Sequence, residues 1–128
     1  MADEVVHLSF PADPSTLSQI RARVEEIAGR LLSPEECEDL KVAVTEACAN
    51  AVLHSGTEEF RVTITSLPDC IEVLVEDDGV YRTTPAPVDG DAKGHRGLLL
   101  MAAMVDDLRL RPGTANAGTQ VLLRKCPS

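Results

Sequence analysis

The segment TEACANAVLHSG, residues 45–56, spaces three polar side chains four positions apart among small and apolar residues. Glu46, Asn50 and His54 carry a carboxylate, an amide and an imidazole. At about 100° per residue, this spacing places them close to one face of a helix. Apolar residues flank the stripe on both sides, and burying a carboxylate without a partner costs several kcal/mol. We therefore expect this polar stripe to be buried against a partner or ligand, with a satisfied buried polar pair as the alternative for Glu46 and Asn50. For His54, a structural role near the helix end is favoured.

A second acid, Asp77, ends a predicted strand. Apolar residues alternate along 71–75, and Asp77 continues their face, so its side chain is predicted to point inward. Gly79 follows and opens a segment, residues 79–97, that is long for a connection and typical of a functional loop or lid. A carboxylate in this position can accept a hydrogen bond from an amino group of a ligand. A simple turn is the alternative, because Asp-Asp-Gly is a good turn sequence.

The end of that segment, KGHRGLLL, is a glycine-bounded turn that enters an apolar helix. Free backbone N–H groups at the start of a helix favour phosphate, and Lys93 and Arg96 add positive charge. The alternative is that these two residues are solvated loop charges without a ligand. Gly118 and Thr119 begin the last predicted strand.

The elements that must position these residues follow from hydrophobic periodicity. Strands are predicted over 5–10, 60–65, 71–75, 108–110 and 119–123, and helices over 14–31, 34–53 and 98–104. Asp13 is the expected cap of the first helix, and Ser33 with Glu36 forms a capping box for the second. This order is typical of an α+β fold, a two-layer sandwich with a mixed, mostly antiparallel sheet and helices on one face.

Composition restricts the classes of function. The 128 residues suit one domain, residues 1–128, with an aliphatic core, since aromatic residues make up 2%. A formal charge of −9 argues against a direct nucleic-acid binder. The four cysteines form no CxxC pair and lack zinc-finger spacing, so neither a disulfide nor a metal site is expected. No leader or membrane-spanning run is present in the sequence, which predicts a cytoplasmic protein without membrane contact.

Taken together, the motifs resemble the ATP-binding superfamily of gyrase, heat-shock chaperones, histidine kinases and MutL, whose domain is the Bergerat-type ATP-binding fold. Within it, the chain resembles the anti-sigma-factor serine/threonine kinases of the RsbW and SpoIIAB kind. EACANAVLH is similar to that family's E-x-x-x-N-A-x-x-H block, EDDG to its D-x-G block, GHRGLLLMAAMVDD to its glycine turn and helix, and GTQV to its last motif. The resemblance runs from HLSF to VLL, nearly the whole chain.

The resemblance implies roles for individual residues. Glu46 is the general base that activates a substrate hydroxyl, and Asn50 is the ligand of a Mg²⁺ that bridges the ATP phosphates. Asp77 reads the adenine amino group, with Gly79 beside the purine and Thr119 near it. The resemblance gives Gly97 the role of anchoring the lid beside the phosphates. The glycine turn also supplies Gly94, and the phosphate contacts fall to Lys93, Gly94, Arg96 and Gly97.

The resemblance also implies partners: an alternative sigma factor of RNA polymerase, an anti-anti-sigma protein that is phosphorylated on Ser or Thr, and a second copy of the chain in a homodimer. Arg21, on the exposed face of the first helix, is a candidate partner contact, and a solvated helix face without a partner is the alternative. Tyr81 and His95 depart from the family's glycine boxes. A module that sequesters a regulatory protein without phosphorylating it is therefore the alternative. A histidine kinase would require a dimerisation helix with a phosphoacceptor His before the ATPase domain. Because the first predicted strand begins almost at residue 1, this alternative is disfavoured.

Overall fold

The computed structural model describes residues 4–54, 59–77, 99–112 and 118–128. Its labelled elements are β1 (Glu4–Pro11), the 3-10 turn η1 (Pro14–Thr16), α1 (Leu17–Ala28), α2 (Pro34–His54), β2 (Glu59–Ser66), β3 (Ile71–Asp77), β4 (Asp107–Pro112) and β5 (Thr119–Lys125). A short helix over residues 99–104 precedes β4. The predicted order of strands and helices is confirmed.

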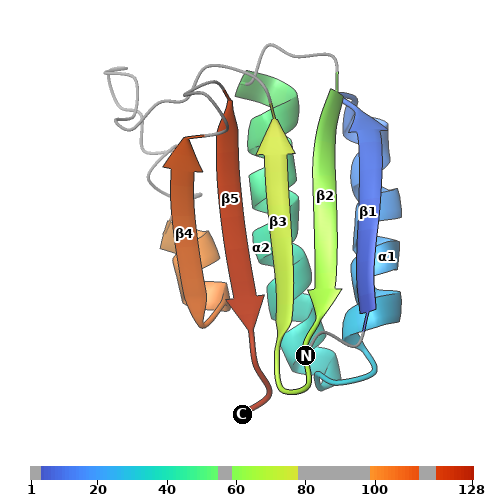
Figure 1. Cartoon of the computed structure of the whole chain (residues 1–128), viewed down its shortest axis with the longest axis vertical. Coiled ribbons are helices and arrows are strands. Elements are labelled where there is room, and N and C mark those ends of the chain that lie inside the picture. Colours follow the sequence, from blue (N-terminus) through green and yellow to red (C-terminus); the bar gives the residue numbers. More distant parts are fainter. Residues whose placement is uncertain (1–3, 55–58, 78–98, 113–117) are drawn as a thin grey trace.

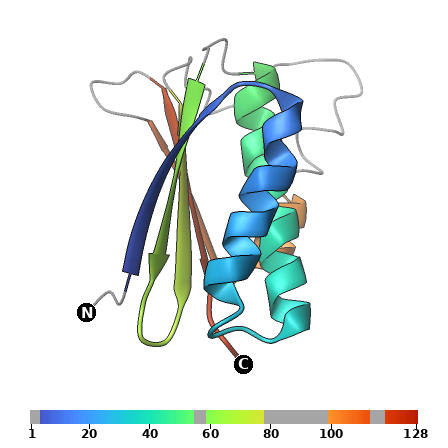
Figure 2. The ribbon, with the colours of Figure 1, turned by 90° about the vertical axis from the view of Figure 1, so that its right-hand side faces the viewer.

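The strands form one sheet in the order β1-β2-β3-β5-β4, and the helices cover one of its faces (Figures 1 and 2). Each neighbouring pair of described strands is antiparallel. The two-layer α+β sandwich is therefore confirmed, and the expected mixed sheet is antiparallel throughout its described strands. The last strand of the chain, β5, lies between β3 and β4. It is therefore an interior strand, next to the central strand β3.

The two long helices begin near the predicted caps. Asp13 accepts a hydrogen bond from the Ser15 amide at 3.0 Å, but the first turn is 3-10 and α1 begins later than predicted, at Leu17. At the start of α2 the predicted capping box is complete. The Ser33 amide donates to Glu36 Oε1 at 2.8 Å, and the Glu36 amide donates to Ser33 Oγ at 3.2 Å.

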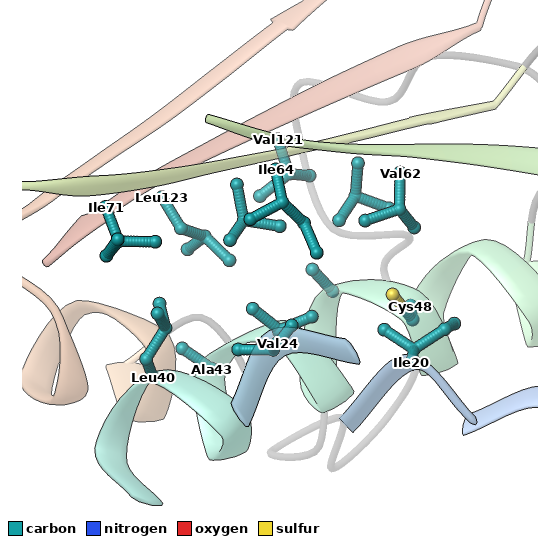
Figure 3. Close-up of a cluster of buried hydrophobic side chains, with 14 of the residues drawn as sticks. Ile20, Val24, Leu40, Ala43, Cys48, Val62, Ile64, Ile71, Val121 and Leu123 are labelled. Carbon is teal, nitrogen blue, oxygen red and sulfur yellow. The ribbon is translucent and has the colours of Figure 1, made fainter. Parts of the chain in front are cut away.

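The core lies between the helices and the inner face of the sheet. Figure 3 shows Ile20 and Val24 of α1 and Leu40 of α2 facing Ile64 and Leu123 of the sheet, and each is 1% exposed or less. Full burial of such a side chain stabilises the fold by about 1.5–3 kcal/mol. As predicted from the composition, this core is almost entirely aliphatic.

One flank of α2 is fixed against α1 by a lysine. Lys41 Nζ lies 3.0 Å from Glu25 Oε1 on α1 and 2.7 Å from Glu38 Oε1 on α2, and its side chain is 13% exposed. The carboxylates hold the pKa of Lys41 above its ordinary value through these hydrogen bonds. The side of α2 that carries Lys41 therefore faces α1, which decides where the polar stripe of the same helix points.

The expectation that the cysteines form no disulfide is wrong for one pair. Cys70 and Cys126 are bonded, with an S–S distance of 2.04 Å. They lie 56 residues apart in sequence, and the pairing of β3 with β5 brings them together. Cys37 and Cys48 are free and buried in α2, as expected of small apolar residues. Burial raises the pKa of Cys48 to about 12, which keeps it a thiol.

Glu36 joins the start of α2 to the end of the chain. Its Oε2 accepts hydrogen bonds from the Ser128 amide at 2.8 Å and the Ser128 hydroxyl at 3.1 Å, beside the capping bond to Ser33. The backbone hydrogen bonds from Ser33 and Ser128 lower the pKa of Glu36 from 4.5 to about 2, because they stabilise the charged carboxylate.

We predict that Glu36→Gln flattens the acid dependence of stability. Because the folded pKa of Glu36 is below the unfolded one, its contribution is fully present above pH 4.5 and is lost as the pH falls toward 2. Urea unfolding between about pH 6 and about pH 3 should show a smaller loss of unfolding free energy in Glu36→Gln than in the wild type. Glu35→Gln, which removes a neighbouring exposed carboxylate, is the control for loss of charge. Equal pH dependence in Glu36→Gln and wild type contradicts this assignment.

Candidate functional site

Two strands and one helix bring their chemistry-bearing residues to the same end of the sandwich. β3 ends there with Asp77, β5 begins there with Thr119, and α2 has its C-terminal end there (Figure 1). Asp77 and Thr119 are direct partners in the antiparallel register. These two sequence-predicted residues, 42 positions apart in the chain, therefore lie side by side on neighbouring strands.

Asp77 lies on the inner face of the sheet, as predicted. Along β3 the side chains alternate between buried and half-buried, and Ile71, Val73 and Val75 share the buried face with Asp77. Asp77 itself is 9% exposed. A carboxylate in an aliphatic setting requires hydrogen-bond donors, since an uncompensated buried charge is costly. Its position suits selective recognition of a donor such as an amino group.

Phe60 is a residue of this site that sequence reasoning passed over. It lies opposite Asp77 in the β2–β3 register and is completely buried. Its ring packs against Phe10, with ring centroids 6.0 Å apart. Two of the three aromatic residues in the chain thus lie in the same register row as Asp77, Phe60 on the adjacent strand β2 and Phe10 on β1. The hairpin register, counted outward from the Ser66–Ile71 pair, is the sequence signal that could have identified this position.

Gly118 fixes how the chain enters β5. Its φ is 79°, in the left-handed region that side chains with a Cβ rarely adopt, and it is buried. Thr119 follows directly and is half-buried. The glycine that begins the last motif is therefore required by the backbone conformation, and it sets the position of Thr119 opposite Asp77.

The polar stripe of α2 is less buried than expected. Glu46 is half-buried and Asn50 is exposed, so the alternative of a satisfied buried polar pair does not hold for Asn50. The physical reason is helical rotation. At about 100° per residue, Glu46 and Asn50 lie about 140° and about 180° around the helix from Lys41, which contacts α1. They occupy the flank of α2 away from α1, on the side where the helix over residues 99–104 lies in Figure 1.

Several predicted residues are not placed. Gly79, Lys93, Gly94, Arg96 and Gly97 lie outside the described residues, as do Tyr81 and His95. Of the phosphate-contact side of the predicted site, the structure therefore describes only the neighbouring helix over 99–104, in which Met101 is 2% exposed. Arg21 is exposed on α1, in the helix on the other side of α2 from Glu46 and Asn50.

Two further features of the described residues concern metal ions and membranes. Within the described ranges, His, Cys, Asp and Glu side chains nowhere gather in a group of three or more that could hold a metal ion. Of the helices that the structure describes, none is both long enough and apolar enough to cross a bilayer.

Comparison with known proteins gives the family. The sequence pattern described as "Histidine kinase-like ATPase domain" matches residues 10–125. The "Serine-protein kinase RsbW" of Bacillus pumilus (strain SAFR-032) is 34% identical in an alignment of 142 positions, gaps included, which covers 95% of this chain and 85% of the relative. The protein of the same name from Bacillus subtilis (strain 168) is 32% identical, covering 84% and 78%. That of Listeria monocytogenes serovar 1/2a (strain ATCC BAA-679 / EGD-e) is 35% identical, covering 86% and 80%.

A solved structure supports the fold. The histidine kinase domain of the blue-light activated histidine kinase from Erythrobacter litoralis EL346 matches with a TM-score of 0.57 at 20% identity. The match covers 91% of this chain and 61% of that chain, and at this identity it shows the fold alone. Fold, motifs and relatives agree, and the chain belongs to the histidine kinase-like ATPase domain family, in the branch that contains the RsbW proteins.

Proposed function

We propose that this chain is an ATP-dependent protein serine/threonine kinase that acts as an anti-sigma factor. It holds an alternative sigma factor of RNA polymerase and phosphorylates an anti-anti-sigma protein. The observation that carries the proposal is the buried carboxylate of Asp77. Asp77 lies opposite Thr119 in the β3–β5 register, at the end of the sandwich where α2 ends. The similarity to proteins named serine-protein kinase RsbW, at 32–35% identity in three species, supports the reaction class.

In this proposal the adenine of ATP lies at the Asp77 end of the sheet. The carboxylate of Asp77 accepts a hydrogen bond from the adenine amino group, with Thr119 beside it on β5. Gly79 gives the purine room to approach. Lys93, Gly94, Arg96 and Gly97 contact the phosphates, where backbone N–H groups and positive charge both favour an anion.

The chemistry of Asn50 fits a magnesium ligand. Mg²⁺ prefers oxygen donors and keeps several waters, so one or two protein ligands suffice when phosphates supply the rest. Asn50 is exposed on the flank of α2 away from α1, where its side-chain amide is accessible to a metal held by phosphates. When bound, the ion neutralises phosphate charge during transfer.

Glu46 is the general base of the proposed reaction. It lies one helical turn before Asn50 and is half-buried, which limits hydration of its carboxylate. The carboxylate takes the proton of the substrate hydroxyl as its oxygen bonds to the γ-phosphorus. The bond from that phosphorus to the β–γ bridging oxygen breaks, and ADP leaves.

The proposed partners are proteins, and the proposed location is the cytoplasm. Arg21, exposed on α1, is the candidate contact for the sigma factor or the anti-anti-sigma protein. In this proposal the chain forms a homodimer and binds neither nucleic acid nor membrane. Exchange between the two partners controls transcription, because a phosphorylated anti-anti-sigma protein can no longer draw the chain away from the sigma factor.

We predict that Asp77→Asn and Asn50→Ala both weaken nucleotide binding, but differently. Loss of a charge-assisted hydrogen bond should cost Asp77→Asn about 10-fold or more in affinity for ATP and ADP, both in the presence and in the absence of Mg²⁺. Asn50→Ala should lose affinity only when Mg²⁺ is present. Calorimetric titration measures both, with Gln19→Ala on α1 as an exposed-amide control and a thermal melt to verify folding. Undetectable nucleotide binding by the folded wild type contradicts the proposal.

We predict that Glu46→Gln abolishes phosphoryl transfer while it preserves binding. Removing a general base should lower the rate about 100-fold or more, and nucleotide affinity should stay within about twofold. The assay follows labelled phosphate from ATP to candidate anti-anti-sigma proteins of the same organism. Undiminished transfer by Glu46→Gln rules out this role, and a wild type that binds ATP and a partner without transfer favours the sequestering module.

A further inference from the structure

The Cys70–Cys126 pair occupies a defined position in the sheet. β3 and β5 pair from Asp77 with Thr119 to Ile71 with Lys125, and the two cysteines are the next opposite positions beyond the end of that ladder. Their Cα atoms are 4.2 Å apart. The bond is therefore a cross-strand link between directly opposed residues.

One backbone group of each cysteine bonds outside the β3–β5 pair. The Cys70 carbonyl accepts from the Leu67 amide at 2.8 Å, within the β2–β3 turn. The Cys126 amide donates to Asp106 Oδ2 at 2.6 Å. Opposed residues that exchange no ladder hydrogen bonds form the close type of antiparallel pair, in which side chains approach most nearly. The local backbone thus sets the two cysteines directly opposite each other at a close approach.

We propose that Cys70 and Cys126 form a reversible dithiol–disulfide pair that exchanges with low-molecular-weight thiols and controls how firmly the end of β5 is anchored. This inference is independent of the proposed kinase activity. The seven register pairs of β3 with β5, and the pairing of β5 with β4, keep the strands in place when the S–S bond is open. The thiols then remain opposed, and closure is an intramolecular step.

The two sulfur atoms differ in accessibility, which sets the order of exchange. Cys70 is 7% exposed, whereas Cys126 is half-buried. An external thiolate attacks Cys126 Sγ and forms a mixed disulfide, while the S–S bond breaks and Cys70 leaves as a thiolate that takes a proton from water. A second external thiolate attacks the external sulfur and releases Cys126 as a thiolate. Two small thiols are thus oxidised to one small disulfide, and one protein disulfide is reduced to two thiols.

The other two cysteines are not expected to take part in thiol–disulfide exchange in the folded protein. Cys37 and Cys48 are buried, and desolvation raises the pKa of both thiols, which lowers the thiolate population that reacts. All four cysteines of the chain are among the described residues. Exchange in the folded protein should therefore involve two of the four sulfur atoms.

The bond lies among contacts that fix the C-terminal segment. Ser128 bonds to Glu36 at the start of α2, and Lys125 Nζ lies 3.7 Å from Asp39 Oδ2. The Asp77–Thr119 pair is at the opposite end of the same ladder, seven residues from Cys70 or about 23 Å away along β3. Reduction should loosen the C-terminal segment and leave the other end of the ladder unchanged.

The first test is a redox titration of the full chain. The protein is equilibrated, from both the oxidised and the reduced side, in mixtures of reduced and oxidised glutathione, quenched with acid, alkylated and analysed by mass spectrometry. We expect one reversible transition that adds two labels, on Cys70 and Cys126. A disulfide that persists in excess reduced glutathione, or one that never forms in oxidised glutathione, overturns the proposal.

Matched variants test the order and the consequence. Cys70→Ser, which keeps the accessible Cys126, should form a glutathione adduct several-fold faster than Cys126→Ser. Reduction should lower the wild-type melting temperature and speed amide exchange at Arg124, Lys125 and Cys126, whereas the double variant Cys70→Ser/Cys126→Ser should not respond to reductant. Equal adduct rates in the single variants, or equal responses of wild type and double variant, contradict the assignment. Nucleotide affinity is measured in parallel and should stay the same in both redox states, so a failure of the proposed kinase activity is seen separately.

Discussion

The antiparallel pairing of β3 with β5 is the interaction on which the rest of this structure depends. The two strands are distant in sequence, and the segment between them includes the helix over 99–104 and β4. Their pairing places Thr119 beside Asp77 at one end and Cys126 opposite Cys70 at the other. It also completes the inner face on which α2 packs. A single register therefore sets the candidate nucleotide end, the covalent link and the centre of the core.

The second constraint is the division of α2 into faces. One face is buried against the sheet, with Leu40 and Val44 completely buried, and an adjacent flank is held to α1 by Lys41. Glu46 and Asn50 lie on the remaining surface of the helix. The helix thus supplies core packing on one side and chemistry on another, and the rotation between them is fixed by helical geometry.

Much of this architecture could be predicted because its signals are local. The alternation along β2 and β3, the capping box of Ser33 with Glu36, and the inward direction of Asp77 each depend on a few neighbouring residues. The exposure of Asn50 could not be predicted in this way, because it depends on which flank of α2 contacts α1. The Cys70–Cys126 bond depends on strand pairing across 56 residues, which cysteine spacing does not reveal. The roles of Glu46, Asn50 and Asp77 stay predictions from resemblance.

The most direct test of the central claim, that the Asp77 end of the sandwich binds nucleotide, is an NMR titration of the isotopically labelled chain with Mg-ADP. The account predicts that the largest amide shifts occur at Asp77, Thr119 and the last turn of α2, with little change at Ile71 and Lys125 at the other end of the same strand pair. Shifts confined to the Ile71–Lys125 end, or to the uncovered face of the sheet, would contradict it.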